Sequence, residues 1–173
     1  MAQAAKTAPA DSLEANEYDG ITISLLTCGP GEEVYTLYGH TAIRICDTTR
    51  HADIVVNYGM FSFRQNFFVA RFILGLTDYM IGITSFSNFV DEYTYEGRWV
   101  YEQVLNLRQE EKKAIIAAID ENSKPENATY RYNCFYNNCT TRARDILTEN
   151  ISGKVGYAPE TWDAPSFRDM CHS

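Results

Sequence analysis

Short apolar runs rich in β-branched residues alternate with helical patterns along this chain, and this mixed order constrains the fold most. The runs at residues 21–27, 40–46 and 53–58 have the length and composition of buried strands. The polar segment DTTRHAD joins the second and third runs, so we expect these two strands to form an antiparallel pair. Further strands are expected at residues 78–84, 99–107 and 130–136.

Helical patterns occupy the segments between these runs. We expect helices over residues 63–74, 87–96 and 139–148. A fourth helix is expected after Asn106, which can cap it, with Glu110 and Glu111 in the first turn and Pro125 at the end. Strands and helices in mixed order favour an α+β fold.

The chain has room for one domain with a sizeable core, because 173 residues are too few for two. Residues 1–19 lack an apolar run and are rich in Ala, Pro, Ser and acids, so we expect a flexible leader there and a single domain over residues 20–173. The most apolar stretch, residues 67–86, contains Arg71 and Asp78, which argues against a membrane span. We therefore expect a soluble domain, with any membrane anchor outside this sequence.

The charge balance excludes some partners. A formal net charge of −8 leaves no basic stripe to neutralise phosphates, so nucleic acid is not an expected partner. The same acidic surface disfavours simple electrostatic docking on anionic lipid.

The cysteines predict neither a zinc site nor a dense disulfide framework. Five are present, with no CxxC pair, and the three histidines are scattered, so we expect no metal and no cofactor. Cys28 and Cys46 adjoin apolar runs and are expected to be small buried side chains. Cys134 and Cys171 are candidates for a disulfide, a pairing that sequence alone leaves open.

Cys139 is the candidate nucleophile. It follows Asn137 and Asn138, which can cap a helix, and so falls on the first turn of the predicted helix. Unpaired amides at a helix start stabilise an anion, which lowers a thiol pKa from about 8.5 toward neutrality. The same amides could serve as oxyanion donors. The alternative is a buried, inert cysteine.

His40 is the best candidate for the base among the three histidines. His172 adjoins the C-terminus and His51 lies in a polar turn, whereas His40 follows Gly39 and opens a predicted strand. A glycine at a strand start permits close backbone approach, and a strand gives the imidazole a rigid mount. The alternative is a hydrogen-bonded histidine with a structural role.

A third group is needed to orient the imidazole. Asn57, at the end of the neighbouring predicted strand, is the first candidate, and it equally fits a strand-end residue that satisfies local backbone. Tyr38 and Asn138 are candidates for contact with a substrate, or turn residues. Arg142 could recognise a substrate carboxylate or phosphate, although a helix-surface ion pair with Asp145 is the simpler explanation.

Four segments carry a resemblance to a known family: in order, YGHTAIRI, VVNYGMFSF, GRWVYEQVLNL and YRYNCFYNNCTTRARDIL. Over residues 21–150 the chain resembles the periplasmic N-terminal domain of the Lnb-type lipoprotein N-acyltransferases of Gram-negative bacteria. More distantly, it is similar to the circularly permuted NlpC/P60 and lecithin–retinol acyltransferase-like thiol enzymes. These relatives imply a permuted papain-like antiparallel sheet packed with helices, with His40 as the family's histidine and Cys139 as its nucleophile.

The resemblance also implies a function. We expect a periplasmic cysteine-dependent acyltransferase that takes an acyl group from a phospholipid or lipoprotein ester and passes it to an amine. Its partners would be lipid or lipoprotein, with membrane contact through segments outside this sequence, and its oligomeric state is left open. The phenylalanine-rich residues 61–72 could line an acyl groove, although a core segment is the simpler interpretation.

Other functions stay open at this point. Attack of water on the acyl-enzyme would make the protein a thioesterase or lipase. An NlpC/P60-like peptidase or amidase would use the same two side chains on cell-wall peptides. A non-catalytic periplasmic binding domain would need neither Cys139 nor His40.

Overall fold

The sheet at the centre of the structure has six antiparallel strands. The computed structural model describes residues 17–33, 36–61, 77–133, 135–153 and 155–156. The strands are β1 (Ile21–Cys28), β2 (His40–Asp47), β3 (Ala52–Met60), β4 (Asp78–Ser85), β5 (Val100–Val104) and β6 (Thr129–Arg131). Their order across the sheet is β5-β1-β2-β3-β4-β6. With three described helices, this confirms the α+β class.

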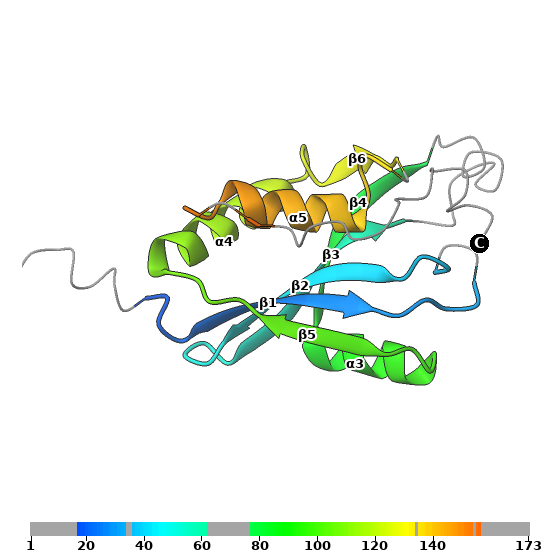
Figure 1. The fold of residues 1–173 in the computed structure, drawn as a ribbon, viewed down its shortest axis with the longest axis horizontal. Helices are drawn as coiled ribbons and strands as arrows, with labels where there is room; N and C mark the ends of the chain where they lie inside the picture. Colours follow the sequence, from blue (N-terminus) through cyan, green and yellow to red (C-terminus); the bar gives the residue numbers. More distant parts are fainter. Residues whose placement is uncertain (1–16, 34–35, 62–76, 134, 154, 157–173) are drawn as a thin grey trace, which may run out of the picture.

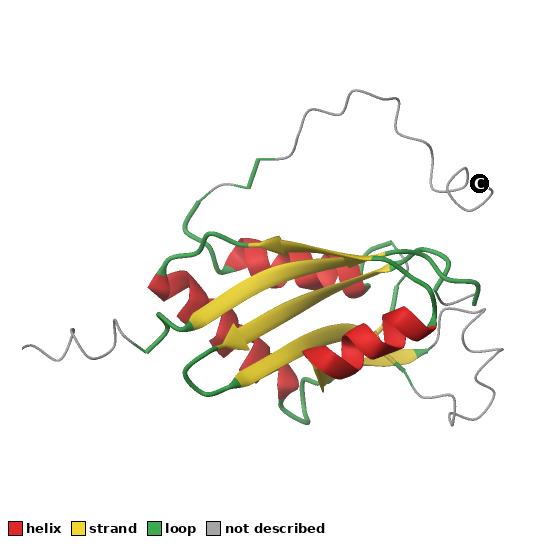
Figure 2. Cartoon of the chain, turned by 90° about the horizontal axis from the view of Figure 1, so that it is seen from below, coloured by secondary structure: helices red, strands yellow, loops and turns green. Residues whose placement is uncertain are grey.

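Helices cover both faces of the sheet. Helices α4 (Gln109–Ser123) and α5 (Cys139–Glu149) lie on one face, and α3 (Phe86–Tyr95) lies on the other (Figure 1). Seen from below, α3 stands in front of the strands with the other two helices behind them (Figure 2). Within the described residues, no helix has the length and apolarity needed to cross a membrane.

Each face of the sheet has its own core. On the α4 and α5 side the fully buried residues include Ile23, Ile43 and Ile115, whereas Leu26 and Phe89 belong to the α3 side. Successive strand residues point to opposite faces, so β1 contributes Ile23 to one core and Leu26 to the other. The two cores hold α5 against β2 and β3 on one face, and α3 against β3 and β4 on the other.

Most expected elements are present with boundaries shifted by a few residues. The expected antiparallel pairing of residues 40–46 with 53–58 is confirmed by β2 and β3, whose register joins Ala42 to Asn57. The expected strand over residues 99–107 is shorter, as β5, and those over 78–84 and 21–27 match β4 and β1. The helix expected over residues 63–74 lies outside the described residues.

The expected strand over residues 130–136 is wrong beyond Arg131. The Asn133 carboxamide oxygen accepts hydrogen bonds from the backbone N–H groups of Phe135 and Tyr136, both at 3.0 Å. This side chain competes for the backbone groups that a strand ladder would use, so the chain turns there. The turn leads directly into α5.

The start of α4 also differs from expectation. Its N-cap is Arg108, not Asn106, and the helix begins at Gln109. The Glu111 carboxylate accepts from the Arg108 backbone N–H at 2.9 Å and from the Ser152 N–H at 2.9 Å. These two backbone hydrogen bonds, and then the Arg108 guanidinium, lower the pKa of Glu111 to about 2. Glu111 thus fixes the helix start and ties α4 to the chain that follows α5.

Candidate functional site

Cys139 is the first residue of α5, as the sequence predicted. Asn138 precedes it in an extended conformation, and its side-chain oxygen accepts from the Thr141 backbone N–H at 2.9 Å. The Asn138 backbone N–H in turn donates to the Thr141 hydroxyl at 2.8 Å. This reciprocal cap satisfies two backbone donors and starts the helix at Cys139. The sulfur is therefore next to the positive end of an eleven-residue helix.

His40 opens β2 and contacts Asn57 on β3. Asn57 pairs in register with Ala42, two residues after His40, so His40 and Asn57 are diagonal neighbours on one face of the sheet. The His40 Nε2 atom lies 3.0 Å from Asn57 Oδ1. Because a carbonyl oxygen only accepts, Nε2 donates in this pair, which leaves Nδ1 for a second partner. The expected proximity of the two side chains is observed.

Two glycines with positive φ lie at this end of the sheet. Gly39 has φ +71°, and a Cβ atom on it would lie 2.5 Å from the carbonyl oxygen of Cys28. Gly59, at a β-bulge of β3, has φ +106°, and a Cβ atom there would lie 3.6 Å from the Cys139 Cβ. Gly39 thus fits the close backbone approach predicted beside His40.

The environment of Cys139 favours the thiolate. Burial raises the pKa of Cys139 and is the largest single influence on it, whereas hydrogen bonding to His40 and the charge of that imidazole lower it. The backbone N–H of Thr41 and the hydroxyl of Thr140 lower it further, and the resulting pKa is about 7. Cys139, His40 and Asn57 are referred to below as the Cys139 cluster.

Cys28 provides the contrast. It is the register partner of His40 and carries a free thiol, as Cys139 does. Burial dominates its environment and raises its pKa to about 11, although Tyr93 and Arg98 lower it in part. Cys28 behaves as the small buried side chain that the sequence predicted, whereas Cys46 is only half-buried. The candidates for a disulfide, Cys134 and Cys171, lie outside the described residues.

Sequence reasoning missed two threonines. Thr41 follows His40 and Thr140 follows Cys139, and their hydroxyl oxygens lie 2.9 Å apart. The Thr140 hydroxyl is also 4.0 Å from the Cys139 sulfur. Threonines are common in strands and helix starts, so neither residue type nor spacing indicated this contact.

The remaining predicted residues surround the Cys139 cluster in different ways. Tyr38 lies in the turn before β2 and is 70% exposed. The side-chain oxygen of Asn138 caps α5. The Arg142 Nε–H donates to Asn137 Oδ1 at 2.7 Å, and its guanidinium lies over the Tyr130 ring, 4.1 Å from the centroid. A role in binding substrate stays a prediction for all three.

The simpler explanation for Arg142 was wrong. Asp145 pairs with Arg144, at 2.6 Å, while Arg142 reaches back to the segment before α5. A residue on the buried side of a helix start finds partners in the preceding turn before it finds a carboxylate on the exposed surface.

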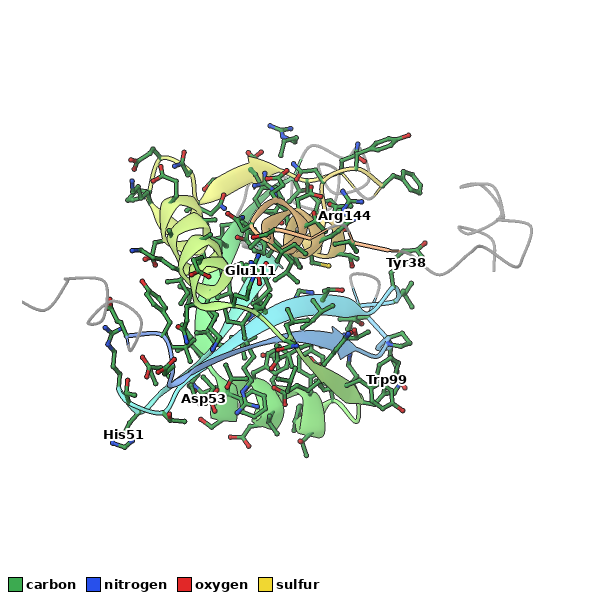
Figure 3. All side chains as sticks on the ribbon, turned by 60° about the vertical axis from the view of Figure 1, so that its left-hand side comes forward. Tyr38, His51, Asp53, Trp99, Glu111 and Arg144 are labelled. Carbon is green, nitrogen blue, oxygen red and sulfur yellow. The ribbon has the colours of Figure 1, made fainter. Side chains whose placement is uncertain are left out.

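The second described histidine, His51, lies far from the Cys139 cluster. His51 is exposed in the β2–β3 turn, at the end of the sheet opposite Tyr38 (Figure 3). His172 lies outside the described residues. In the part of the chain that the structure describes, no group of three His, Cys, Asp or Glu side chains could hold a metal ion.

A separate concavity of about 300 Å³ lies between α3, β1 and β5. Its lining includes Leu26, Tyr93 and Arg98 but no member of the Cys139 cluster. The concavity therefore belongs to the α3 side of the sheet and not to the candidate site.

Comparisons with known proteins agree with the resemblance noted in the sequence. A family model described as the Lnb N-terminal periplasmic domain matches residues 8–166. Comparison with curated proteins found no match, and comparison with solved structures found none.

Proposed function

Because the chain belongs to the family of the Lnb N-terminal periplasmic domain, and is thus a periplasmic domain, we propose that it is a cysteine-dependent acyltransferase in lipoprotein processing. Cys139 is the proposed nucleophile, His40 the base and Asn57 the group that orients the imidazole. A phospholipid or lipoprotein ester would supply the acyl group, and an amine would receive it.

The observation that carries this proposal is the environment of one thiol. Cys139 has a pKa of about 7 although burial opposes ionisation, and its sulfur lies at a helix start beside His40. A thiol that is half ionised near neutral pH is a strong nucleophile. Structural cysteines such as Cys28, with a pKa raised to about 11, lack this property.

The first half-reaction makes a thioester. His40 takes the thiol proton on Nδ1, while Nε2 stays hydrogen-bonded to Asn57. The sulfur attacks the ester carbonyl, and the resulting oxyanion rests against first-turn amides of α5 that have no intrahelical partner. When the ester C–O bond breaks, His40 returns the proton to the leaving alkoxide, which departs as an alcohol.

The second half-reaction transfers the acyl group. An amine, which the family suggests is the N-terminus of a lipoprotein, attacks the thioester carbonyl. The C–S bond breaks, an amide forms, and His40 passes the amine proton to the departing sulfur. Water in place of the amine would release a fatty acid and regenerate the same thiol.

The fold proposed for this chemistry is a permuted papain-like one. It is supported by the order of the elements, in which the strand that begins at His40 precedes the helix that begins at Cys139. Pairing of that strand with the one that carries Asn57 also supports it.

The test is intact-mass spectrometry after incubation with phospholipid micelles, followed by peptide mapping. We expect an acyl adduct on Cys139, lost in Cys139→Ala and formed at least about a hundredfold more slowly in His40→Ala, since general bases typically contribute that much. Cys46→Ala, which removes a half-buried free thiol on the same strand as His40, is the matched control and should keep the adduct.

Other outcomes would reassign the protein. Turnover of a cell-wall peptide without any lipid adduct would indicate an NlpC/P60-like peptidase. A Cys139 thiol that iodoacetamide does not modify at pH 7 would indicate a non-catalytic binding domain, and the proposed chemistry would be wrong.

A further inference from the structure

A hydroxyl bridge connects the two elements that carry the Cys139 cluster. Thr41 on β2 and Thr140 on α5 are 99 residues apart in the chain, yet their Oγ1 atoms lie 2.9 Å apart. The second of these oxygens is within 4.0 Å of the Cys139 sulfur, the reach of a hydrogen bond to sulfur. Each threonine directly follows a member of the Cys139 cluster, so the bridge runs beside the reacting atoms.

We propose that Thr140 is a positioning residue that donates a hydrogen bond to the Cys139 thiolate and is oriented for this by Thr41. The proposal rests on the proposed function only in taking Cys139 as the nucleophile. It adds a side-chain hydroxyl donor to the stabilisation of the thiolate by His40, the Thr41 N–H and the helix start.

The direction of the bridge follows from what each group can do. A hydroxyl has one hydrogen to donate and lone pairs to accept, whereas a thiolate only accepts. When Thr140 donates to the charged sulfur, its oxygen is left to accept the Thr41 hydroxyl hydrogen. The hydrogen bonds then run from Thr41 through Thr140 to the sulfur. They are strongest when the sulfur is charged.

Because the hydroxyl hydrogens point toward the sulfur, the bridge would change the reactivity of Cys139 and not only the packing of α5 on β2. A neutral thiol gains little from a hydroxyl donor, so the bridge favours the ionised sulfur over the protonated one. The lowered pKa of Cys139, to which Thr140 contributes, agrees with this.

Other titratable groups also face the sulfur and must be kept constant in a test. They come from three strands: His40 from β2, Cys28 from β1 and Tyr130 from β6. Thr140→Val leaves all of them in place and replaces one hydroxyl by a methyl group of similar size.

The experiment measures the rate of Cys139 alkylation by iodoacetamide from pH 5 to 10, with the modified residue identified by peptide mapping. We expect Thr140→Val to move the midpoint upward by about 0.5 to 1 pH unit, the size expected for losing one hydroxyl donor to an anion. Below the midpoint, alkylation should slow by about three- to tenfold. Thr140→Ser keeps the hydroxyl and should restore the wild-type midpoint.

Two further variants separate the proposal from a structural role. Thr41→Val should give a smaller shift in the same direction, and adding it to Thr140→Val should change nothing more, because the donor chain is already cut. Thr22→Val, at an exposed β1 position beside Cys46 and away from His40, is the matched control with the wild-type midpoint expected.

An unchanged midpoint in folded Thr140→Val would overturn the proposal, as would a Thr140→Ser midpoint as high as that of the valine variant. Alkylation requires no lipid. A shifted midpoint in a protein that forms no acyl adduct would therefore uphold the role of Thr140 while the proposed function fails.

Discussion

Gly39 is the single residue that most tightly fixes the start of β2. Its N–H donates to the Thr36 carbonyl at 3.0 Å, and its backbone is in the left-handed region with φ +71°. A side chain there would collide with the Cys28 carbonyl. The position of His40, the next residue, therefore depends on a residue without a Cβ atom.

Gly39→Ala should destabilise the protein by about 3 kcal/mol or more, because left-handed strain adds to an overlap with backbone. Gly97→Ala is the matched control. Gly97 also has positive φ, at +66°, but nothing lies within 4 Å of a Cβ atom there, so only the strain of about 1 kcal/mol applies. Urea unfolding measures both, and equal losses would contradict the overlap at Gly39.

Residue types led to three side chains that the structure brings together, and gave little indication of the residues around them. Cys139 and His40 stood out because a helix start and a strand start change their chemistry, and Asn57 followed from strand pairing. Thr41 and Thr140 did not, because their contact spans 99 residues and depends on how α5 packs on β2.

At the scale of elements, the start of α5 places Cys139 in the first turn of a helix, beside the positive helix end. Asn138 caps it, as Ser85 caps α3, where the serine oxygen accepts from the Asn88 backbone N–H. In both caps a side-chain oxygen accepts from a backbone N–H of the first turn, and only the cap of α5 adjoins the Cys139 cluster.

Asn138→Ala and Ser85→Ala should each lower the free energy of unfolding by about 1 kcal/mol, as loss of a cap typically does. Only Asn138→Ala should also slow alkylation of Cys139 at pH 7, because fraying of the first turn of α5 weakens the positive helix end beside the sulfur. Urea unfolding and iodoacetamide kinetics on both variants test this. If the Ser85 variant slows alkylation equally, the effect comes from global loosening and not from the helix start.

Local patterns predicted the existence of most elements better than their ends. Asn106 looked like a cap, yet the backbone N–H of Leu105 still bonds the Ile23 carbonyl in the sheet, which delays the helix to Gln109. The strand after Thr129 stops early because Asn133 folds the backbone into a turn. The start of α4 and the end of β6 therefore depend on hydrogen bonds that the spacing of apolar residues does not reveal.

At the scale of the whole molecule, the fold and the ionisation of Cys139 depend on each other. The sequence indicated an α+β protein, but the sheet order, with β5 beside β1 and β6 beside β4, comes from long-range packing. That order places β2 at the centre, where α5 covers it. Stabilising the thiolate therefore also stabilises the folded chain.

The stability of the protein should rise with pH because of Cys139. The folded pKa of about 7 is below the unfolded value of about 8.5. The contribution is therefore fully present above about pH 8.5 and is lost as pH falls through about 7. Urea unfolding of the reduced protein between pH 6 and 9.5 should show that the free energy of unfolding of the wild type increases with pH relative to that of Cys139→Ser. Parallel curves for the two proteins would show that folding does not favour the thiolate.

The contact between β2 and α5 also determines when, during synthesis and folding, the Cys139 thiol becomes strongly nucleophilic. Because the chain is synthesised from its N-terminus, β2 is made first, and α5 follows about a hundred residues later. Until α5 packs on β2, Cys139 lacks the contacts with His40 and the Thr41 N–H that lower its pKa, so only a small fraction of this thiol is ionised at pH 7. The lowered pKa of Cys139 is thus acquired only when the fold is complete, and the pH midpoint of alkylation at this one residue would distinguish folded from unfolded molecules in a mixed population.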